Sequence, residues 1–186
     1  FETVFLIKLN FLMSAGTRWG RVTLWAAAVD GDIERCKKRL INSEANVDEL
    51  DSDGRSPLLL ACRYGNLEVV KLLIEHGANI DHAYDYNDDC ALHFAAENGH
   101  DEVVKYLVND LKQDINMLNG TGSTPLIQAA SKGKGSTITL LMSLGADLKI
   151  KNTHGRTAYQ CAPSADIKEL LTTVNYTSAV NYGNKH

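Results

Sequence analysis

Cysteine and histidine side chains that could bind a transition metal gather near the middle of the chain. Cys90 and His93 stand three residues apart, a spacing that puts both on one face of a helix, and His76, His82 and His100 flank them. A structural zinc site needs about four converging ligands, and no second pair at metal-binding spacing follows. We therefore expect no metal and no other cofactor.

The segment Gly133-Lys134-Gly135-Ser136-Thr137 has the composition of a phosphate-binding loop. Such a loop requires Ser or Thr directly after the Lys, and here Gly135 follows it. A phosphate-binding loop also comes directly after a buried strand, whereas the residues before Gly133 have the apolar spacing of a helix. We therefore expect Lys134 to begin a helix with Ser136 in its first turn, and no nucleotide site.

Candidate nucleophiles and acids are also poorly placed. Nucleophilic catalysis requires a Cys or Ser beside a His and an orienting carboxylate. Cys36 and Cys62 fall at apolar helix positions and should be buried and inert, while the position of Cys161 leaves its burial open. The aspartate pairs at 51/53 and 88/89 fall in polar loops open to water, an environment unsuited to acid catalysis. We predict that the protein is not an enzyme.

The composition excludes other classes. Of the 186 residues, 44% are hydrophobic and 23% charged, which excludes wholesale disorder, and a net charge of −4 does not suit a nucleic-acid partner. The most apolar run, residues 4–13, is interrupted by Lys8 and Asn10 and is shorter than the roughly 18 to 20 residues of a membrane helix. Four cysteines without a C-x-x-C pair favour free thiols. We expect a cytoplasmic protein, with the nucleus as the alternative, and no membrane partner.

The elements that position these residues follow from an internal repeat. Three columns recur every 34 residues: Leu24, Leu58, Leu92 and Leu126; Ala27, Ala61, Ala95 and Ala129; and Gly31, Gly65, Gly99 and Gly133. A shortened fifth copy follows with Tyr159 and Ala162, one residue early in phase. Repetition at this period is typical of a solenoid.

Each copy predicts two short helices and a loop. In residues 56–65, apolar side chains at helical spacing predict a helix that Ser56 caps, with Pro57 in its first turn and Gly65 at its end. Residues 67–78 predict a second amphipathic helix, and a polar loop leads to the next copy. The alanine column lets neighbouring helices approach closely. Because so short a unit cannot bury its own apolar face, the units must stack.

These units resemble ankyrin repeats. Ser56-Pro57-Leu58, Ala91-Leu92-His93 and Thr124-Pro125-Leu126 match the family's Thr-Pro-Leu-His segment, and Gly99-His100-Asp101-Glu102-Val103-Val104 and Gly77-Ala78-Asn79 match its second-helix and C-terminal patterns. The resemblance implies an all-α ankyrin-repeat solenoid with an N-terminal cap, three internal repeats and a truncated C-terminal cap. It also implies that His93 forms hydrogen bonds between adjacent loops and helix starts.

The resemblance suggests the domain boundaries. We expect a repeat domain over residues 17–174, an unassigned stretch over 1–16 (an extension or a fragment edge) and a flexible tail over 175–186. The five units would span about residues 17–52, 53–86, 87–120, 121–153 and 154–174.

The copies also differ from one another. Copies one and three each carry one extra residue after the second helix, at 41–46 and 109–114. The extra residue of copy two falls in the loop 81–89, which should be the longest finger. Because Gly135, Ser136, Thr137 and Thr139 are weak helix formers, the fourth unit should be the least stable internal one.

By the resemblance, partners bind the concave surface that the loop fingers and inner helices form. The corresponding finger residues are Ser52, Asp53, Arg55, Tyr84, Tyr86, Asn87, Asp88, Thr121, Ser123, Thr153, His154 and Arg156. The corresponding inner-helix residues are Val29, Asp30, Arg63, Tyr64, Glu97, Asn98, Ser131 and Lys132. Because Tyr and Arg dominate interface energetics, we expect the centre at Arg55, Arg63, Tyr64, Tyr84 and Tyr86. Charges of both signs around it, from Asp53, Asp88, Glu97, Lys132 and Arg156, favour a protein partner with both signs.

The sequence thus predicts a monomeric protein–protein interaction module that acts as a scaffold, an adaptor or an inhibitor. One alternative is the recognition fragment of a larger enzyme or channel. A second alternative is a small metal- or nucleotide-dependent enzyme. The identity of the partner cannot be read from the scaffold, because specificity lies in surface residues.

Overall fold

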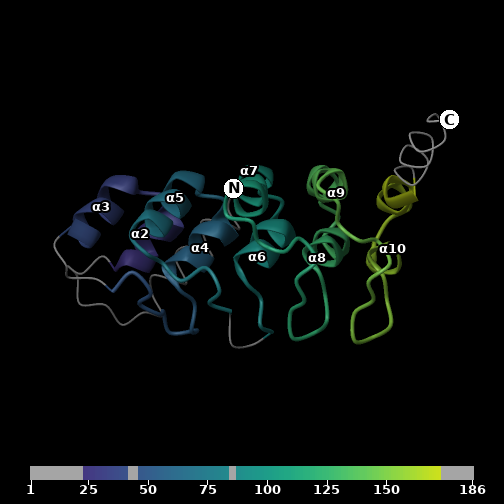
Figure 1. Ribbon diagram of the computed structural model, residues 1–186, viewed down its shortest axis with the longest axis horizontal. Helices are drawn as coiled ribbons and strands as arrows, with labels where there is room; N and C mark the ends of the chain where they lie inside the picture. Colours follow the sequence, from purple (N-terminus) through teal and green to yellow (C-terminus); the bar gives the residue numbers. More distant parts are fainter. Residues whose placement is uncertain (1–22, 42–45, 84–86, 173–186) are drawn as a thin grey trace.

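The computed structural model describes residues 23–41, 46–83 and 87–172 as a row of stacked helical pairs (Figure 1). The inner helices are α2 (Leu24–Asp30), α4 (Pro57–Tyr64), α6 (Ala91–Asn98), α8 (Pro125–Ser131) and α10 (Ala158–Cys161). The outer helices are α3 (Ile33–Ile41), α5 (Leu67–Glu75), α7 (Asp101–Lys105) with its continuation η1 (Tyr106–Asp110), and α9 (Gly135–Ser143). Residues 165–172 are helical after α10. The predicted all-α solenoid is confirmed.

Three layers are visible in Figure 1: a row of outer helices, a row of inner helices, and loops that project from the inner row on the opposite side. Each inner helix packs on the inner helices of the neighbouring units, and α2, α4, α6 and α8 also pack on the outer helices of their own units. In the three described ranges, no helix has the length and hydropathy that a bilayer-spanning segment needs. The expectations for residues 1–16, for the tail 175–186, and for Tyr84 and Tyr86 lie outside the described residues.

The inner helices begin and end as their sequences predict. The hydroxyls of Thr23, Ser56 and Thr124 each accept a hydrogen bond from the backbone N–H three residues on, at 3.2 to 3.3 Å. At the other end of α4, Gly65 has a left-handed conformation with φ of 75°, and its N–H caps the last carbonyls of the helix. Local cap chemistry therefore sets the length of each inner helix.

The core runs along the stack between the two rows of helices. Its leucine and alanine columns are almost completely buried: Leu24, Leu58, Leu92 and Leu126, with Ala27, Ala61, Ala95 and Ala129. Because alanine has so small a side chain, the inner helices can lie close together while the leucines fill the space between layers. This packing is the physical reason for the period of 34 residues.

The extra residue of the third unit is absorbed inside its outer helix. Residues 101–105 are α-helical, and residues 106–110 continue as the wider π-helix η1. The backbone N–H of Leu111 then donates to the carbonyl of Tyr106 at 3.2 Å. We expected the insertion after the helix, but widening the last turn keeps Leu107 fully buried against the core. The loop 81–89 is described only in part, so its expected greater length stays a prediction.

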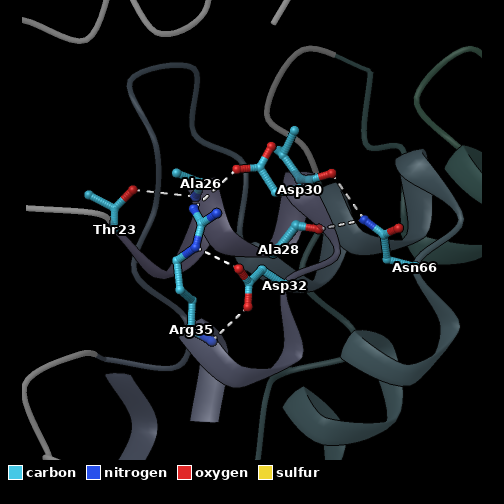
Figure 2. Close-up of polar contacts among 8 residues, drawn as sticks. Thr23, Ala26, Ala28, Asp30, Asp32, Arg35 and Asn66 are labelled. Atoms are coloured by element: carbon cyan, nitrogen blue, oxygen red, sulfur yellow. Dashed lines mark hydrogen bonds and ion pairs between the residues drawn. The ribbon is translucent and has the colours of Figure 1, made fainter. Parts of the chain in front are cut away.

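Two polar side chains connect neighbouring units at equivalent positions, just before an outer helix. Asn66 Nδ2 donates to the carbonyls of Ala28 at 2.7 Å and Val29 at 3.1 Å (Figure 2). One repeat later, His100 Nε2 lies 2.8 Å from the carbonyl of Arg63. Both contacts supply donors to the end of the preceding inner helix, where carbonyls lack partners within the helix. They therefore fix the spacing of successive units.

The outer helices present a charged surface to solvent. Glu68 and Lys71 form an ion pair of 2.9 Å on α5, and Glu102 and Lys105 form one of 2.7 Å on α7. Both are spaced by three residues on one helix, and their side chains are well exposed. Such pairs stabilise a helix only slightly and indicate a solvated face.

We expect Gly135→Ala to stabilise the protein by about 0.5 to 1 kcal/mol, because alanine is the better helix former at the start of α9. An added Cβ would meet only methyl groups of Ile167 and Leu170, both at 3.8 Å. Urea unfolding followed by circular dichroism measures the change. The matched control is Gly65→Ala, which should destabilise because φ is 75° and the new Cβ would collide with the ring of His100. Equal or lower stability of Gly135→Ala would contradict the prediction.

Candidate interaction surface

Three of the projecting loops, called fingers below, turn in the same way. At the base of each, an Asp or Asn side chain accepts hydrogen bonds from the backbone N–H groups two and four residues further on. Asp51, Asn119 and Asn152 make these bonds at 2.8 to 3.0 Å. In each turn the N–H of the base residue also donates to the carbonyl four residues on, at 3.0 to 3.1 Å. The fingers are therefore ordered before any partner arrives, which lowers the entropy cost of binding.

Arg55, expected at the centre of the partner site, instead holds its own finger together. Its Nε donates to Asp51 Oδ2 at 2.8 Å, and its guanidinium also pairs with Asp53. Only 14% of the side chain of Arg55 is exposed, against 52% for Asp53. The Arg55 guanidinium is thus paired with two carboxylates. Of Asp51, Asp53 and Arg55, Asp53 is the residue that a partner can reach.

The finger of the third unit is bonded to that of the fourth through buried polar groups. His93 Nε2 lies 3.0 Å from the carbonyl of Ser123, while His93 Nδ1 accepts from the backbone N–H of Cys90 at 3.4 Å. Beside them, Asn119 Nδ2 donates to Asp89 Oδ1 at 2.7 Å. The role that the family resemblance implied for His93, a link between adjacent loops and a helix start, is confirmed.

Cys90 and His93 also contact each other through their side chains. The Cys90 thiol lies 3.0 Å from His93 Nδ1 and 3.0 Å from the sulfur of Met117. Burial raises the pKa of Cys90 and lowers the pKa of His93, so both are neutral near pH 7. Across residues 23–41, 46–83 and 87–172, no three His, Cys, Asp or Glu side chains converge as metal ligands would.

The thiols of Cys36 and Cys62 are not activated either. Cys36 and Cys62 are fully buried and Cys161 is half-buried, and all four cysteines are free. Burial raises the pKa of Cys36 to about 11, and it also raises the pKa of Cys62. A nucleophilic thiol needs a lowered pKa, so these environments do not favour nucleophilic catalysis.

Neighbouring fingers also form backbone contacts. The N–H of Gly120 donates to the carbonyl of Asn87 at 2.6 Å, and that of Thr153 donates to the carbonyl of Thr121 at 2.9 Å. Asp88, which follows Asn87, is exposed and has a positive φ of 51°. Among the described residues, backbone bonds therefore join the fingers around Asn87, Thr121 and Thr153.

The ends of the inner helices supply the other half of the candidate surface. Arg63 and Tyr64, at the end of α4, are both half-buried, and the Arg63 guanidinium lies 5.5 Å from the centre of the Phe94 ring. Glu97 on α6 forms an ion pair of 3.0 Å with Lys132, which follows α8. These contacts join adjacent units along the surface.

Several other predicted contact residues are less available than expected. Asn98 donates its side-chain N–H to the carbonyl of Phe94 at 2.8 Å, and Asp30 pairs with Arg35 at 3.3 Å (Figure 2). Val29 and Ser123 are buried, so the expectation that they face a partner is not met.

Two groups of exposed and half-exposed residues remain. On the fingers these are Ser52, Asp53, Asn87, Asp88, Thr121, Thr153, His154 and Arg156, and on the inner helices Arg63, Tyr64, Glu97, Asn98, Ser131 and Lys132. Together they are called the finger–helix surface below. It carries charges of both signs, and most of its inner-helix charges are already paired.

Comparison with known proteins gives one family and several relatives. The model of ankyrin repeats (three copies) matches residues 23–119 and 92–180. The chain is 32% identical over 116 residues to the ankyrin repeat protein nuc-2 of Neurospora crassa, which covers 62% of the chain. It is also 32% identical to transient receptor potential cation channel subfamily A member 1, over 141 residues in Drosophila melanogaster and 161 in Homo sapiens, covering 74% and 86% of the chain. The matched regions make up only 11% to 14% of these relatives.

Proposed function

The chain belongs to the ankyrin repeat family, and we propose that it works as a protein–protein interaction module, a scaffold, adaptor or inhibitor that binds its partner on the finger–helix surface. The observation that carries this proposal is the set of pre-ordered fingers beside half-buried Arg63 and Tyr64. A rigid surface that displays tyrosine and arginine among polar groups suits the recognition of another folded or extended protein.

The chemistry of the surface supports a protein partner over the other classes. Glu97 and Asp53 lie beside the cations Lys132 and Arg55, so the surface lacks the uniform positive charge that a nucleic acid or an anionic membrane requires. We propose that the chain is a monomer without catalytic activity. We place it in the cytoplasm, with the nucleus as the alternative, because its thiols are unpaired, as is usual in reducing compartments.

The test compares two variants that each lose one lysine–glutamate ion pair. Glu97→Ala/Lys132→Ala removes a pair of 3.0 Å on the finger–helix surface, and Glu68→Ala/Lys71→Ala removes a pair of 2.9 Å on the outer helix α5. In quantitative affinity capture from the native cell, we expect the first variant to lose its partners at least fivefold and the second to retain them, since interface residues act through direct contact. Equal retention by both, with unchanged circular dichroism, would place the binding site elsewhere.

A second candidate function is favoured by the match to channel subunits. The two relatives named as cation channels match 74% and 86% of the chain, which in turn covers 12% and 14% of their length. The chain would then be the recognition part of a longer protein, and the same surface would bind a partner or another part of that protein. Sequencing the full transcript tests this: an open reading frame that continues into membrane-spanning segments supports it, and stop codons at both ends exclude it. No contact among the described residues favours the metal- or nucleotide-dependent enzyme.

A further inference from the structure

Some cations on and beside the finger–helix surface form ion pairs with carboxylates, and others do not. Arg55 is paired with two aspartates, and Lys132 is paired with Glu97. Arg63 has no carboxylate within ion-pair distance in the part of the chain that the structure describes. Arg156 is also without such a partner there, but it is exposed on the last described finger, where water can reach it.

The contacts that hold Arg63 in place include no carboxylate of the described residues. Arg63 lies in the last turn of α4, its backbone carbonyl is bonded to His100 at 2.8 Å, and its guanidinium lies 5.5 Å from the centre of the buried Phe94 ring. A cation over an aromatic ring keeps its charge, and its N–H groups can still donate to an oxygen acceptor. Arg63 as a whole residue is half-buried, so a carboxylate of a partner can reach it.

The position of Arg63 suits a group that enters from a partner. Tyr64 is adjacent and half-buried, and the Glu97–Lys132 pair on the next units is neutral as a whole. A carboxylate that approaches Arg63 would therefore meet a cation that no carboxylate of the described residues pairs with, and an aromatic side chain adjacent to it in the sequence. Arginine binds carboxylates through two parallel N–H···O bonds, which are among the stronger polar contacts in proteins.

From these observations we propose that Arg63 binds the carboxylate of an Asp or Glu side chain in a partner segment that packs against Tyr64. This inference rests on the proposed function, because it names the chemistry of the partner at the same surface. The occupant is an acidic peptide segment of another protein, and its acidic residue lies over the second and third units of the stack.

The experiment uses the whole chain and a phage-displayed library of random 16-residue peptides. We expect the selected peptides to be richer in Asp and Glu than the starting library. For the tightest peptide, fluorescence anisotropy should show at least tenfold weaker binding to Arg63→Gln and an intermediate loss for Arg63→Lys, since lysine keeps the charge but not the two-bond geometry. Replacing the critical acidic residue of the peptide by Lys should restore binding to Arg63→Glu.

The matched control is Lys71→Gln. Lys71 belongs to the same unit and also lies over an aromatic ring, 6.0 Å from that of Tyr106, but on the outer helix α5. Its loss should change binding less than twofold. If peptides bind wild type and Arg63→Gln equally but lose affinity for Tyr64→Ala, the inference about Arg63 is wrong and the interaction surface stands. If no peptide is selected, both proposals fail. Both also fail if peptide affinity is unchanged when Arg63, Tyr64 and the Glu97–Lys132 pair are each replaced.

Discussion

His93→Ala is expected to lower the free energy of unfolding by about 2 to 4 kcal/mol, one of the two largest single-residue losses in this chain. The imidazole is almost completely buried, and its two nitrogens are bonded to the carbonyl of Ser123 and to the backbone N–H of Cys90. Alanine would leave the N–H of Cys90 without this acceptor, would leave the Ser123 carbonyl with its bond from the N–H of Asn119, and would open a cavity between two fingers. Urea unfolding at pH 7.5, followed by circular dichroism, measures the loss.

A second variant separates hydrogen bonding from packing. His93→Leu places there the residue type that the second unit has at the equivalent position, Leu59. Leucine restores most of the volume but none of the hydrogen bonds, so we expect this variant to recover only part of the stability, because buried unpaired polar groups remain costly. A His93→Leu protein as stable as wild type would show that the hydrogen bonds of His93 between the two fingers contribute nothing to the free energy of unfolding.

The pH dependence of stability gives an independent readout of the same residue. Burial holds the pKa of His93 below its ordinary value, so the unfolded chain takes up this proton at a higher pH than the folded one. The contribution of neutral His93 is therefore complete above the unfolded pKa of about 6.5 and is lost progressively as the pH falls below it. His93→Leu should lose less stability than wild type between pH 6.5 and pH 5. The control His154→Ala removes an exposed histidine and should leave the wild-type slope unchanged.

Those features of the fold that are set within one unit could be predicted from the sequence. The columns that contain Leu58 and Ala61 locate the buried face, and Ser56, Pro57 and Gly65 mark the start and end of α4 by local chemistry. None of these assignments depends on where a distant residue lies. The same reasoning explains why His93 and Cys90, at a helix start, form a structural contact.

The partners of individual polar side chains, within a finger or between units, could not be predicted. The sequence puts Arg55 at a finger position, but it does not show that Asp51 and Asp53 hold its guanidinium. It shows two polar residues, Asn66 and His100, one repeat apart before an outer helix, yet their carbonyl partners belong to the preceding unit. The period of 34 residues could have identified that pair as a contact between units. For Arg55, the two aspartates nearby in the sequence were a signal that its guanidinium is neutralised within its own finger.

The second large effect is expected at the middle of the stack. Leu92 is completely buried in α6, which packs between α4 and α8 (Figure 1). Leu92→Ala should cost about 3 to 5 kcal/mol, because it removes a buried side chain from a site that cannot collapse fully. In a solenoid each unit is stabilised mainly by its neighbours, so a weak central interface should also uncouple the units on either side.

The chain offers a direct probe of this uncoupling, because both tryptophans, Trp19 and Trp25, precede the first outer helix. Their fluorescence reports the N-terminal end, whereas circular dichroism reports every helix. In wild type the two urea transitions should coincide, as for one cooperative unit, and in Leu92→Ala their midpoints should separate. The control Ile41→Ala shortens an apolar side chain that is 72% exposed, and it should leave the transitions coincident and nearly unshifted. If the two transitions of Leu92→Ala coincide, the cooperative unfolding of the stack depends on contacts other than those of α6 with α4 and α8.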